Sequence, residues 1–300
     1  MQIPVKKLNN GFEMPVFGIG TYNVLAENDN NVFLPDSDWQ KEISILCEAI
    51  ELGVTHIDTA ESYAQGNAEK LIGRAIKNYN RNKLFLVSKV KLDNLSYNGI
   101  NSAVQNSLER MQTNYLDLYL MHRCPPLDKF EECVKAMNEL IEKGLVKNIG
   151  LSNTNTLHTK MLSKISKYPF VVNQVHLNLQ FREPEKDGLV NFCQKNDMLL
   201  EAWRPVNKGA LTKSGVNITK PGISLLDEMC KKYNKTPAQI SINWLISQNN
   251  IITLAKSSNI EHLKENLGSF GWSMNPEDIE KLKTEFPDQK FISDTVTLAK

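Results

Sequence analysis

Ile57-Asp58-Thr59-Ala60-Glu61-Ser62-Tyr63 is the stretch of sequence from which the predicted fold can be worked outward. It continues an apolar run that starts at Val54, so it predicts a buried strand that ends in the carboxylate of Asp58. A carboxylate at the end of a buried strand is costly unless it pairs with a cation or accepts hydrogen bonds. The stretch therefore predicts a cationic partner for Asp58, with Tyr63 following five residues later.

The next two apolar runs end in side chains that could meet this aspartate. The predicted strand at 84–88 is followed by Lys89, and the predicted strand at 116–121 is followed by His122. The carboxyl ends of the strands in a parallel barrel share one face, and the active sites of such barrels lie on that face. The lysine and the histidine are therefore expected beside the aspartate and the tyrosine.

Strand and helix signals alternate along the whole chain. Residues 3–20 predict a hairpin over Asn9-Asn10-Gly11 and then a first barrel strand at 16–20. Apolar residues at helical spacing from Trp39 to Ile50 predict a first helix. Further strands are expected at 54–57, 84–88, 116–121, 147–151, 171–174, 198–203 and 251–255, and further helices at 67–78, 99–111, 128–143, 155–166, 185–196 and 259–268.

Eight strand–helix units indicate an α/β protein, a (β/α)8 TIM barrel that forms a single domain over residues 1–300. The N-terminal hairpin and extra C-terminal helices are additions; one helix opens with the capping-box sequence Thr236-Pro237-Ala238-Gln239 and another opens at Asn275-Pro276. Polar loops are expected at 22–37 and 206–222. A doubly wound open sheet is the alternative, but it usually has fewer strands and a glycine-rich first turn, which this sequence lacks.

Two glycines in the first barrel strand, Gly18 and Gly20, could serve a ligand. Without a side chain, each would let a ligand approach the backbone closely. A lone Gly-x-Gly usually marks only a turn, so this feature assigns nothing by itself.

Composition excludes several kinds of partner. Three hundred residues with 41% hydrophobic side chains can bury a large core, and a formal net charge of +1 provides no domain-scale basic field for nucleic acid. No stretch approaches the length of a membrane span, and residues 1–7 are too polar for a signal peptide. A cytoplasmic protein without a metal site is expected, because the five scattered cysteines form neither a CxxC nor a metal-ligand spacing: Cys47, Cys124, Cys133, Cys193 and Cys230.

The side chains at the predicted strand ends suggest an acid catalyst. Tyrosine is a weak acid with a pKa of about 10, and a neighbouring Lys89 ammonium would lower that pKa for Tyr63. Asp58 could hold the lysine in place, while His122 could hydrogen-bond the same substrate oxygen. Such a site protonates a carbonyl oxygen while hydride reaches the carbon. No side chain supplies hydride, so a nicotinamide cofactor is implied.

Further stretches belong with these residues: Phe17-Gly18-Ile19-Gly20-Thr21, Ser88-Lys89-Val90, Tyr115-Leu116-Asp117-Leu118-Tyr119-Leu120-Met121-His122, Ile149-Gly150-Leu151-Ser152-Asn153, Asn173-Gln174-Val175, Ala255-Lys256-Ser257 and Glu265-Asn266. In this order they resemble an aldo-keto reductase over essentially the whole chain. The run from Lys256 to His262 is closest in pattern to bacterial-type reductases of small 2-oxoaldehydes such as methylglyoxal. The resemblance implies that Tyr63 is the general acid and that Lys89 lowers its pKa. Asp58 would pair with the lysine, and the histidine would orient the carbonyl group.

The resemblance also implies NADP(H) as the cofactor. Ser152, Asn153 and Gln174 match the positions that hold the carboxamide of nicotinamide, and Lys256 and Ser257 match those near the adenosine 2′-phosphate. The positions implied for cofactor binding are Gly20, Thr21, Asp58, Ser152, Asn153, Gln174, Trp203, Arg204, Lys256, Ser257, His262, Glu265 and Asn266.

Three of these positions depart from the usual pattern of the family. Trp203 stands where a tyrosine usually stacks under nicotinamide, and its larger face can still stack. Arg204 replaces a small residue near the pyrophosphate, where it would add a phosphate contact or remain a surface cation. His262 stands where many relatives have an arginine at the 2′-phosphate, so Lys256 is expected to carry most of the preference for NADPH over NADH.

The loops predict a small carbonyl substrate. The connection after His122 is short, whereas many steroid- and sugar-reducing relatives have a long loop there. Arg123 stands where the family often has tryptophan, and Arg123 and Tyr22 are the residues expected to contact substrate. A shallow pocket with Arg123 on its rim suits small, polar, anionic or dicarbonyl compounds; an Arg123 that pairs with a nearby acid is the alternative. The predicted reaction is reduction of small aldehydes and ketones, including 2-oxoaldehydes and aryl aldehydes, to alcohols.

Two other functions remain open. A nicotinamide-binding regulatory or structural subunit of the same fold is one, although it would have no need of a tuned acid. A barrel lyase or isomerase with a Schiff base on Lys89 is the other, but it would leave Ser152, Asn153 and Gln174 unexplained. No nucleic-acid or membrane partner is expected, and the chain is expected to be a monomer or a weak homo-oligomer.

Overall fold

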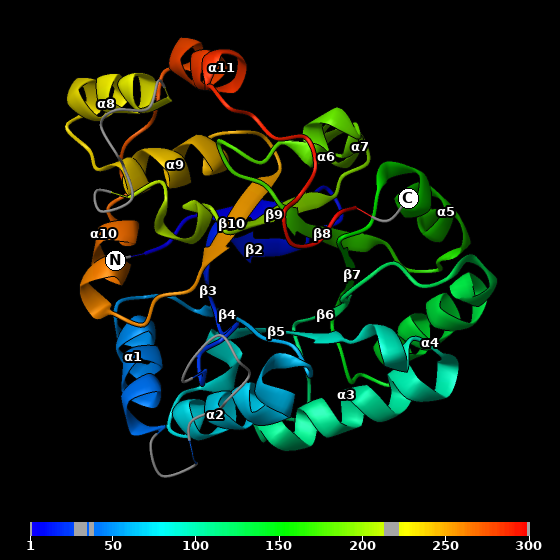
Figure 1. Cartoon of the computed structure of the whole chain (residues 1–300). Helices are drawn as coiled ribbons and strands as arrows, with labels where there is room; N and C mark the ends of the chain where they lie inside the picture. The colour runs from blue at the N-terminus through cyan, green and yellow to red at the C-terminus, as the bar shows by residue number, and fades with distance from the viewer. Residues whose placement is uncertain (1, 27–34, 36–38, 213–221, 299–300) are drawn as a thin grey trace.

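Eight parallel strands close into a barrel at the centre of the molecule (Figure 1). The computed structural model describes residues 2–26, 35, 39–212 and 222–298. Around the barrel the strands follow the order β10, β3, β4, β5, β6, β7, β8 and β9, which confirms the predicted (β/α)8 fold. The bounds of these strands are β3 Phe17–Gly20, β4 His56–Asp58, β5 Phe85–Val90, β6 Leu118–Met121, β7 Ile149–Ser152, β8 Phe170–His176, β9 Leu199–Trp203 and β10 Ile251–Ala255.

Helices surround the barrel and bury one face of each against it (Figure 1). On α4, for example, Phe130, Val134 and Met137 are buried at the spacing of one helical face. Burying a large apolar side chain of this kind contributes roughly 1.5–3 kcal/mol. The helices are α1 Gln40–Glu51, α2 Asn67–Ile76, α3 Tyr97–Met111, α4 Phe130–Glu142, α5 Thr156–Ile165, α6 Glu183–Lys186, α7 Leu189–Lys195, α8 Gly222–Tyr233, α9 Pro237–Ile246, α10 Ile260–Leu267 and α11 Pro276–Glu285.

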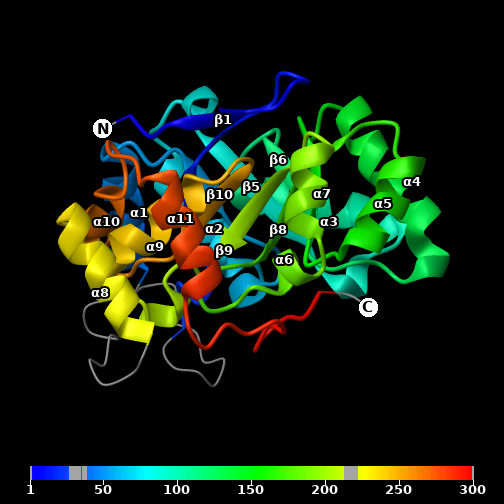
Figure 2. The same cartoon turned by 90° about the horizontal axis from the view of Figure 1, so that it is seen from above.

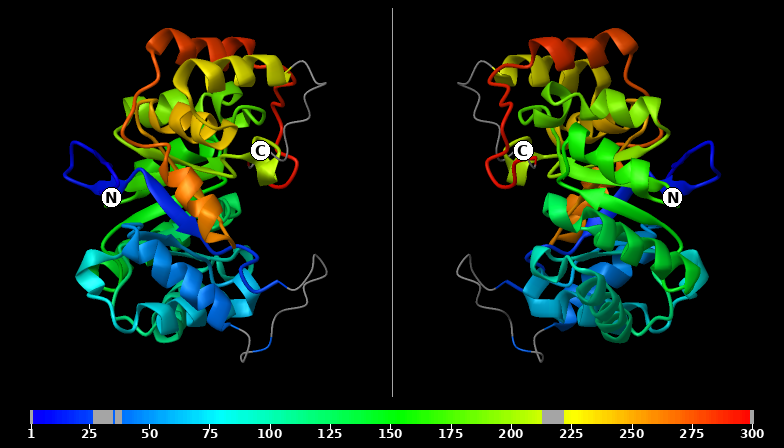
Figure 3. Two further views of the ribbon diagram at one scale, coloured as in Figure 1. Left: turned by 90° about the vertical axis from the view of Figure 1, so that its left-hand side faces the viewer. Right: turned by 90° about the vertical axis from the view of Figure 1, so that its right-hand side faces the viewer.

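The predicted N-terminal hairpin is present and covers the amino end of the barrel. It consists of β1 (Val5–Lys7) and β2 (Glu13–Pro15), paired antiparallel. Lys6 Nζ donates a hydrogen bond of 2.7 Å to the backbone O of Ile251, the first residue of β10. Figures 2 and 3 show the hairpin at the end of the molecule opposite to the C-terminal tail, residues 287–298. The carboxyl ends of the strands therefore remain available for a site.

The glycines of β3 make room for other barrel side chains. A Cβ added at Gly18 would lie 2.3 Å from His56 Nδ1 on the neighbouring strand. A Cβ added at Gly20 would lie 2.9 Å from Leu254 Cδ1 on the other neighbouring strand. Inside the barrel, the space of the side chains that these two glycines lack is taken by a histidine ring and a leucine.

Several boundaries differ from the predicted ones. β5 and β8 extend beyond their predicted carboxyl ends, so Lys89 lies within a strand rather than after it, and Gln174 is followed by two more strand residues. The helix predicted at 185–196 is divided into α6 and α7, because Gly188 between them adopts a left-handed φ of 82°. The predicted capping box at the start of α9 is present, with both of its reciprocal hydrogen bonds.

Much of the two predicted polar loops lies outside the described residues, namely 27–34 and 36–38 of the first loop and 213–221 of the second. Among the described residues, no helix is long and apolar enough to cross a membrane. None of the five cysteines, all of them described, forms a disulfide.

Candidate active site

Asp58 and Lys89 form a buried ion pair near the carboxyl ends of the adjacent strands β4 and β5. Lys89 Nζ lies 2.7 Å from Asp58 Oδ1 and donates a second hydrogen bond of 2.8 Å to the backbone O of Thr59. Burial alone lowers the pKa of the Lys89 ammonium, but the charges of Asp58 and Tyr63 raise this pKa above its ordinary value. The lysine therefore carries its charge inside the barrel, where Asp58 balances it.

Tyr63 follows β4 in the short 3-10 turn Tyr63–Gly66, and its hydroxyl lies 3.5 Å from Lys89 Nζ. The turn contains left-handed φ values of 48° at Ala64 and 56° at Gln65, which cost a non-glycine residue about 1–2 kcal/mol each. Burial raises the pKa of Tyr63, and the Lys89 charge lowers it only in part. The expectation of a lowered pKa is therefore corrected, because desolvation outweighs the lysine. Tyr63 holds its proton at neutral pH.

His122 follows β6 and faces the tyrosine. The two ring centroids are 5.6 Å apart in an edge-to-face arrangement, and His122 Nδ1 lies 3.4 Å from Ser62 Oγ. Burial, Lys89 and Arg123 together lower the pKa of His122 to about 3. The imidazole is therefore neutral across the physiological range, so it can donate a hydrogen bond to a carbonyl oxygen but is no source of an acidic proton.

Ser152, Asn153 and Gln174 lie together near the carboxyl ends of β7 and β8. Most of their side-chain N–H and O–H groups already donate hydrogen bonds within the protein. Ser152 Oγ donates to the backbone O of Gln174 at 2.9 Å, and Asn153 Nδ2 donates to Ser152 Oγ at 2.9 Å. Gln174 Nε2 donates to both Asp58 Oδ2 and Glu201 Oε2, each at 2.8 Å. Gln174 can therefore meet a carboxamide only through its Oε1, as a hydrogen-bond acceptor.

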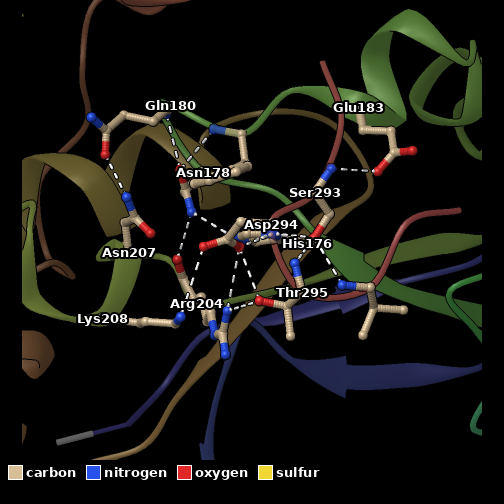
Figure 4. Close-up of polar contacts among 12 residues, drawn as sticks. His176, Asn178, Gln180, Glu183, Arg204, Asn207, Lys208, Ser293, Asp294 and Thr295 are labelled. Atoms are coloured by element: carbon tan, nitrogen blue, oxygen red, sulfur yellow. Dashed lines mark hydrogen bonds and ion pairs between the residues drawn. The ribbon is translucent and has the colours of Figure 1, made fainter. Parts of the chain in front are cut away.

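Trp203, the last residue of β9, is one layer of an aromatic stack. Its ring lies 4.1 Å from that of His176 at an angle of 8°, and the His176 ring lies 4.4 Å from that of Phe181 at 23°. His176 is buried and its Nδ1 lies 2.8 Å from Ser293 Oγ of the C-terminal tail (Figure 4). Trp203 Nε1 donates to Asn153 Oδ1 at 3.3 Å, so the indole is held at its edge as well as by stacking.

Arg204 turns toward the C-terminal tail. Its Nη1 lies 3.6 Å from Asp294 Oδ1 and donates to Thr295 Oγ1, and Lys208 Nζ lies 3.7 Å from Asp294 Oδ2 (Figure 4). Asn178 Nδ2 donates to the backbone O of Arg204 at 2.9 Å. The guanidinium predicted to touch a cofactor phosphate, or to remain a surface cation, is thus engaged by an acid of the tail.

The residues matched to the adenosine 2′-phosphate lie at the start of α10. Lys256 is exposed and its Nζ donates to the backbone O of Asn23 at 3.3 Å. Ser257 Oγ donates to the backbone O of Asn259, the N-cap residue of α10, and His262 is exposed on the first turns of that helix. The amino end of a helix favours a phosphate group. Two further positions assigned to the cofactor lie near the end of the same helix: Glu265, half-buried, and Asn266, buried.

The predicted substrate residues border the tyrosine. Tyr22 is 51% exposed, and its ring lies 5.3 Å from that of Tyr63 in an edge-to-face contact. Arg123 is half-buried directly after the histidine, and burial lowers the pKa of its guanidinium. Thr21 Oγ1 donates to the backbone O of Asp58 at 3.0 Å, which ties the end of β3 to the ion pair.

Two buried ionisable residues beside this site were not predicted from the sequence: His56 of β4 and Glu201 of β9. A signal for Glu201 exists, because it lies two residues before Trp203 in a strand and so points to the same side. His56, Asp58 and Glu201 have ligand atoms within 4.8 Å of one another, as a metal site would require. The ammonium of Lys89 already neutralises Asp58, so the charges do not favour a further cation.

Comparison with known proteins decides the family. The profile of the Aldo/keto reductase family matches residues 18–284 of the chain. The chain belongs to the aldo-keto reductases. This result confirms the predicted family and the predicted enzyme class, an NAD(P)H-dependent oxidoreductase.

Individual members of the family match this aldo-keto reductase over nearly its whole length. The glyoxal reductase of Bacillus subtilis (strain 168) is 32% identical over 286 residues, which cover 95% of this chain and 93% of that protein. The structure of the thermostable aldo-keto reductase Tm1743 in complex with the inhibitor epalrestat has a TM-score of 0.86 and 34% identity, covering 94% and 99% of the two chains. The aldo/keto reductase of Klebsiella pneumoniae in complex with NADP and acetate has a TM-score of 0.81 and 26% identity, covering 99% and 100%.

The side chains of this aldo-keto reductase fit a nicotinamide dinucleotide by their chemistry. Trp203 offers an aromatic ring already held on one face, and Gln174 offers an amide carbonyl for a carboxamide. The start of α10, with Lys256 and Ser257, suits a phosphate. The charge of Arg204, another predicted contact, is already paired with Asp294 of the C-terminal tail.

Proposed function

We propose that this enzyme reduces small aldehydes and ketones, including 2-oxoaldehydes and aryl aldehydes, with NADPH and with Tyr63 as the general acid. One observation carries the proposal: the Tyr63 hydroxyl lies 3.5 Å from the Lys89 ammonium, which is itself 2.7 Å from Asp58, with the His122 ring alongside. The names of the relatives support it, because one is a glyoxal reductase and another was crystallised with NADP.

Each residue of the group has one task. When bound, NADPH supplies the hydride. Tyr63 gives its proton to the substrate oxygen, and the nearby Lys89 charge stabilises the tyrosinate that remains. Neutral His122 donates a hydrogen bond to the same oxygen and sets its direction. Asp58 keeps the lysine in place, since an unpaired ammonium at that depth would be costly.

The surroundings favour a small, polar substrate. Tyr22 and Arg123 border Tyr63, and a guanidinium there suits a carbonyl compound with a second polar or anionic group. We further propose that the chain works as a single barrel domain, as a monomer or weak homo-oligomer, in the cytoplasm. The eight-stranded closed barrel supports the first of these points, and five described cysteines without a disulfide support the last.

The test is steady consumption of NADPH, followed by its absorbance over many turnovers, with methylglyoxal, phenylglyoxal or a nitrobenzaldehyde. We expect turnover with at least one of these compounds and production of the corresponding alcohol. Tight binding of NADPH with no turnover on any of them would point instead to a nicotinamide-binding regulatory subunit. Consumption of an aldehyde without oxidation of NADPH would point to a lyase or isomerase.

A further inference from the structure

His56 of β4 and Glu201 of β9 are fully buried ionisable side chains that the proposed mechanism does not use. Glu201 Oε1 lies 3.4 Å from His56 Nε2, and Glu201 Oε2 accepts a hydrogen bond of 2.8 Å from Gln174 Nε2. The same Gln174 nitrogen donates to Asp58 Oδ2 at 2.8 Å. One amide group thus joins Glu201 to the aspartate of the catalytic ion pair.

The charges around Glu201 disfavour a second anion. The charged and titratable groups that face it are His56 and Asp58 from β4 and Lys89 from β5. The single ammonium of Lys89 is already balanced by Asp58, and another buried carboxylate would have no cation of its own. Burial and then Asp58 raise the pKa of Glu201 to about 8, whereas burial and then Lys89 lower the pKa of His56 to about 3. Both groups are then neutral at pH 7.

The contacts place the proton of Glu201 on Oε1. Oε2 already accepts from Gln174, so the acid O–H is on the oxygen that faces His56 Nε2. Neither Glu201 Oε1 nor His56 Nε2 makes a hydrogen bond as placed among the described residues, and an unprotonated Nε2 at 3.4 Å offers this O–H an acceptor. Its ring is fixed by close packing, because it fills the space that a side chain at Gly18 would need.

We propose that Glu201, in its protonated form, is a positioning residue for Gln174 and for the Asp58–Lys89 pair. As a neutral acid it accepts one of the two amide hydrogens of Gln174, so that Gln174 presents its own Oε1 to the carboxamide of nicotinamide. It also leaves Asp58 as the one anion beside Lys89. The inference deepens the proposed function and rests on it for its effect on catalysis.

Ionisation of Glu201 would make Tyr63 a weaker acid. A second negative charge next to Asp58 makes Tyr63 harder to deprotonate, so reduction slows at alkaline pH. Glutamine at position 201 copies the neutral acid, because its Oε1 can accept from Gln174 and its Nε2 can donate to His56. Methionine has a similar length but offers Gln174 no comparable acceptor.

The kinetic test compares Glu201→Gln with Glu201→Met across pH. At pH 6.5 we expect Glu201→Gln to stay within about threefold of wild type in kcat and in KM for NADPH, while Glu201→Met loses about tenfold or more in kcat, because one buried amide hydrogen of Gln174 is left unpaired. Between pH 7 and 9 the wild-type rate should fall, and the rate of Glu201→Gln should not fall in that interval. A glutamine variant as impaired as the methionine variant, or one with the same alkaline fall as wild type, overturns the proposal.

An infrared measurement detects the protonated Glu201 directly. It needs neither carbonyl reduction nor a folded methionine variant. The spectrum of wild type minus that of Glu201→Gln at pH 6.5 should contain the C=O stretch of a protonated, buried carboxylic acid, and the band should disappear as the pH is raised through about 8. Absence of the band at pH 6.5 overturns the proposal even if the enzyme reduces aldehydes. A band in a protein that reduces none of them supports the protonated Glu201 and contradicts only the proposed function.

Discussion

The two ends of the candidate site differ in how far their charges are withdrawn from water. At the acid end, Lys89 is fully buried, ion-paired with Asp58 and hydrogen-bonded to a backbone carbonyl. At the phosphate end, Lys256 is exposed and donates to one backbone oxygen at 3.3 Å. Charges interact strongly in the interior and are screened at the surface. Lys89 should therefore affect both catalysis and the stability of the fold, whereas Lys256 should affect only the affinity for the cofactor.

The largest expected effect is that of Tyr63→Phe at the acid end. This change removes the proton donor and very little packing, so the turnover number for carbonyl reduction should fall by about three decades while the Kd for NADPH stays nearly unchanged. Stopped-flow turnover and fluorescence titration with NADPH provide the two numbers. Tyr22→Phe is the matched control, since that exposed ring only borders Tyr63. Activity of Tyr63→Phe within tenfold of wild type would exclude Tyr63 as the acid.

The next effect compares one substitution at both ends, Lys89→Met and Lys256→Met. Removing the buried lysine leaves Asp58 without its cation, which should lower the free energy of unfolding by about 3–5 kcal/mol. Removing the exposed lysine should change it by less than about 0.5 kcal/mol. Urea unfolding of both variants checks the difference. Equal losses would mean that the two ends differ less in their electrostatics than their exposure indicates.

A smaller effect is expected on cofactor choice. Lys256→Met should weaken binding of NADPH by about one to two decades, because a charge-assisted hydrogen bond to the 2′-phosphate contributes roughly 1.5–3 kcal/mol, and it should leave binding of NADH unchanged. Salt should reduce the preference for NADPH in wild type, since the lysine is exposed. Lys264→Met, on α10 and paired with Glu261, is the control. An equal loss of affinity for NADH would show that Lys256 does not contact the 2′-phosphate.

A further effect concerns acid stability and depends on His122. The pKa of His122 is lowered by burial to about 3 from an ordinary 6.5, so the unfolded chain binds more protons between these values. Its stabilisation is complete above pH 6.5 and is lost as the pH falls toward 3, by up to about 1.4 kcal/mol per pH unit. His122→Gln should therefore make the stability less dependent on pH in this window. Urea unfolding of wild type and of His122→Gln at pH 4.5–7 gives the two pH dependences; equal dependences would contradict this prediction.

The acid end could be predicted from the sequence because its residues follow from strand periodicity. Asp58 and His122 stand where apolar runs end, and a carboxylate at such a place demands the cation that Lys89 provides. Whether the pKa of Tyr63 is raised or lowered in the folded protein could not be predicted in this way. It depends on the balance between desolvation and the lysine charge, and this balance needs the depth of the hydroxyl in the folded protein.

The contacts of Arg204 and Glu201 also could not be predicted from the sequence. Arg204 meets Asp294 across about ninety residues of chain, from a tail that has no periodic pattern to predict its path. Glu201 lies in the middle of an apolar strand, where an acid can be recognised as inward-pointing. One of its neighbours, His56, comes from β4, which is not adjacent to β9 in the barrel. Side-chain contacts between remote strands depend on the register of the closed barrel, which local patterns do not specify.

Barrel closure also has a consequence for how the chain is made. Closure pairs β3 with β10, with Phe17 beside Thr253. At a synthesis rate of about 5–20 residues per second, the roughly 240 residues between these partners take roughly 12–50 s to emerge, and during that time one edge of β3 has no strand to pair with. Nascent chains that stop short of β10 should thus depend on chaperones on the ribosome, and release of the last strand should end that dependence.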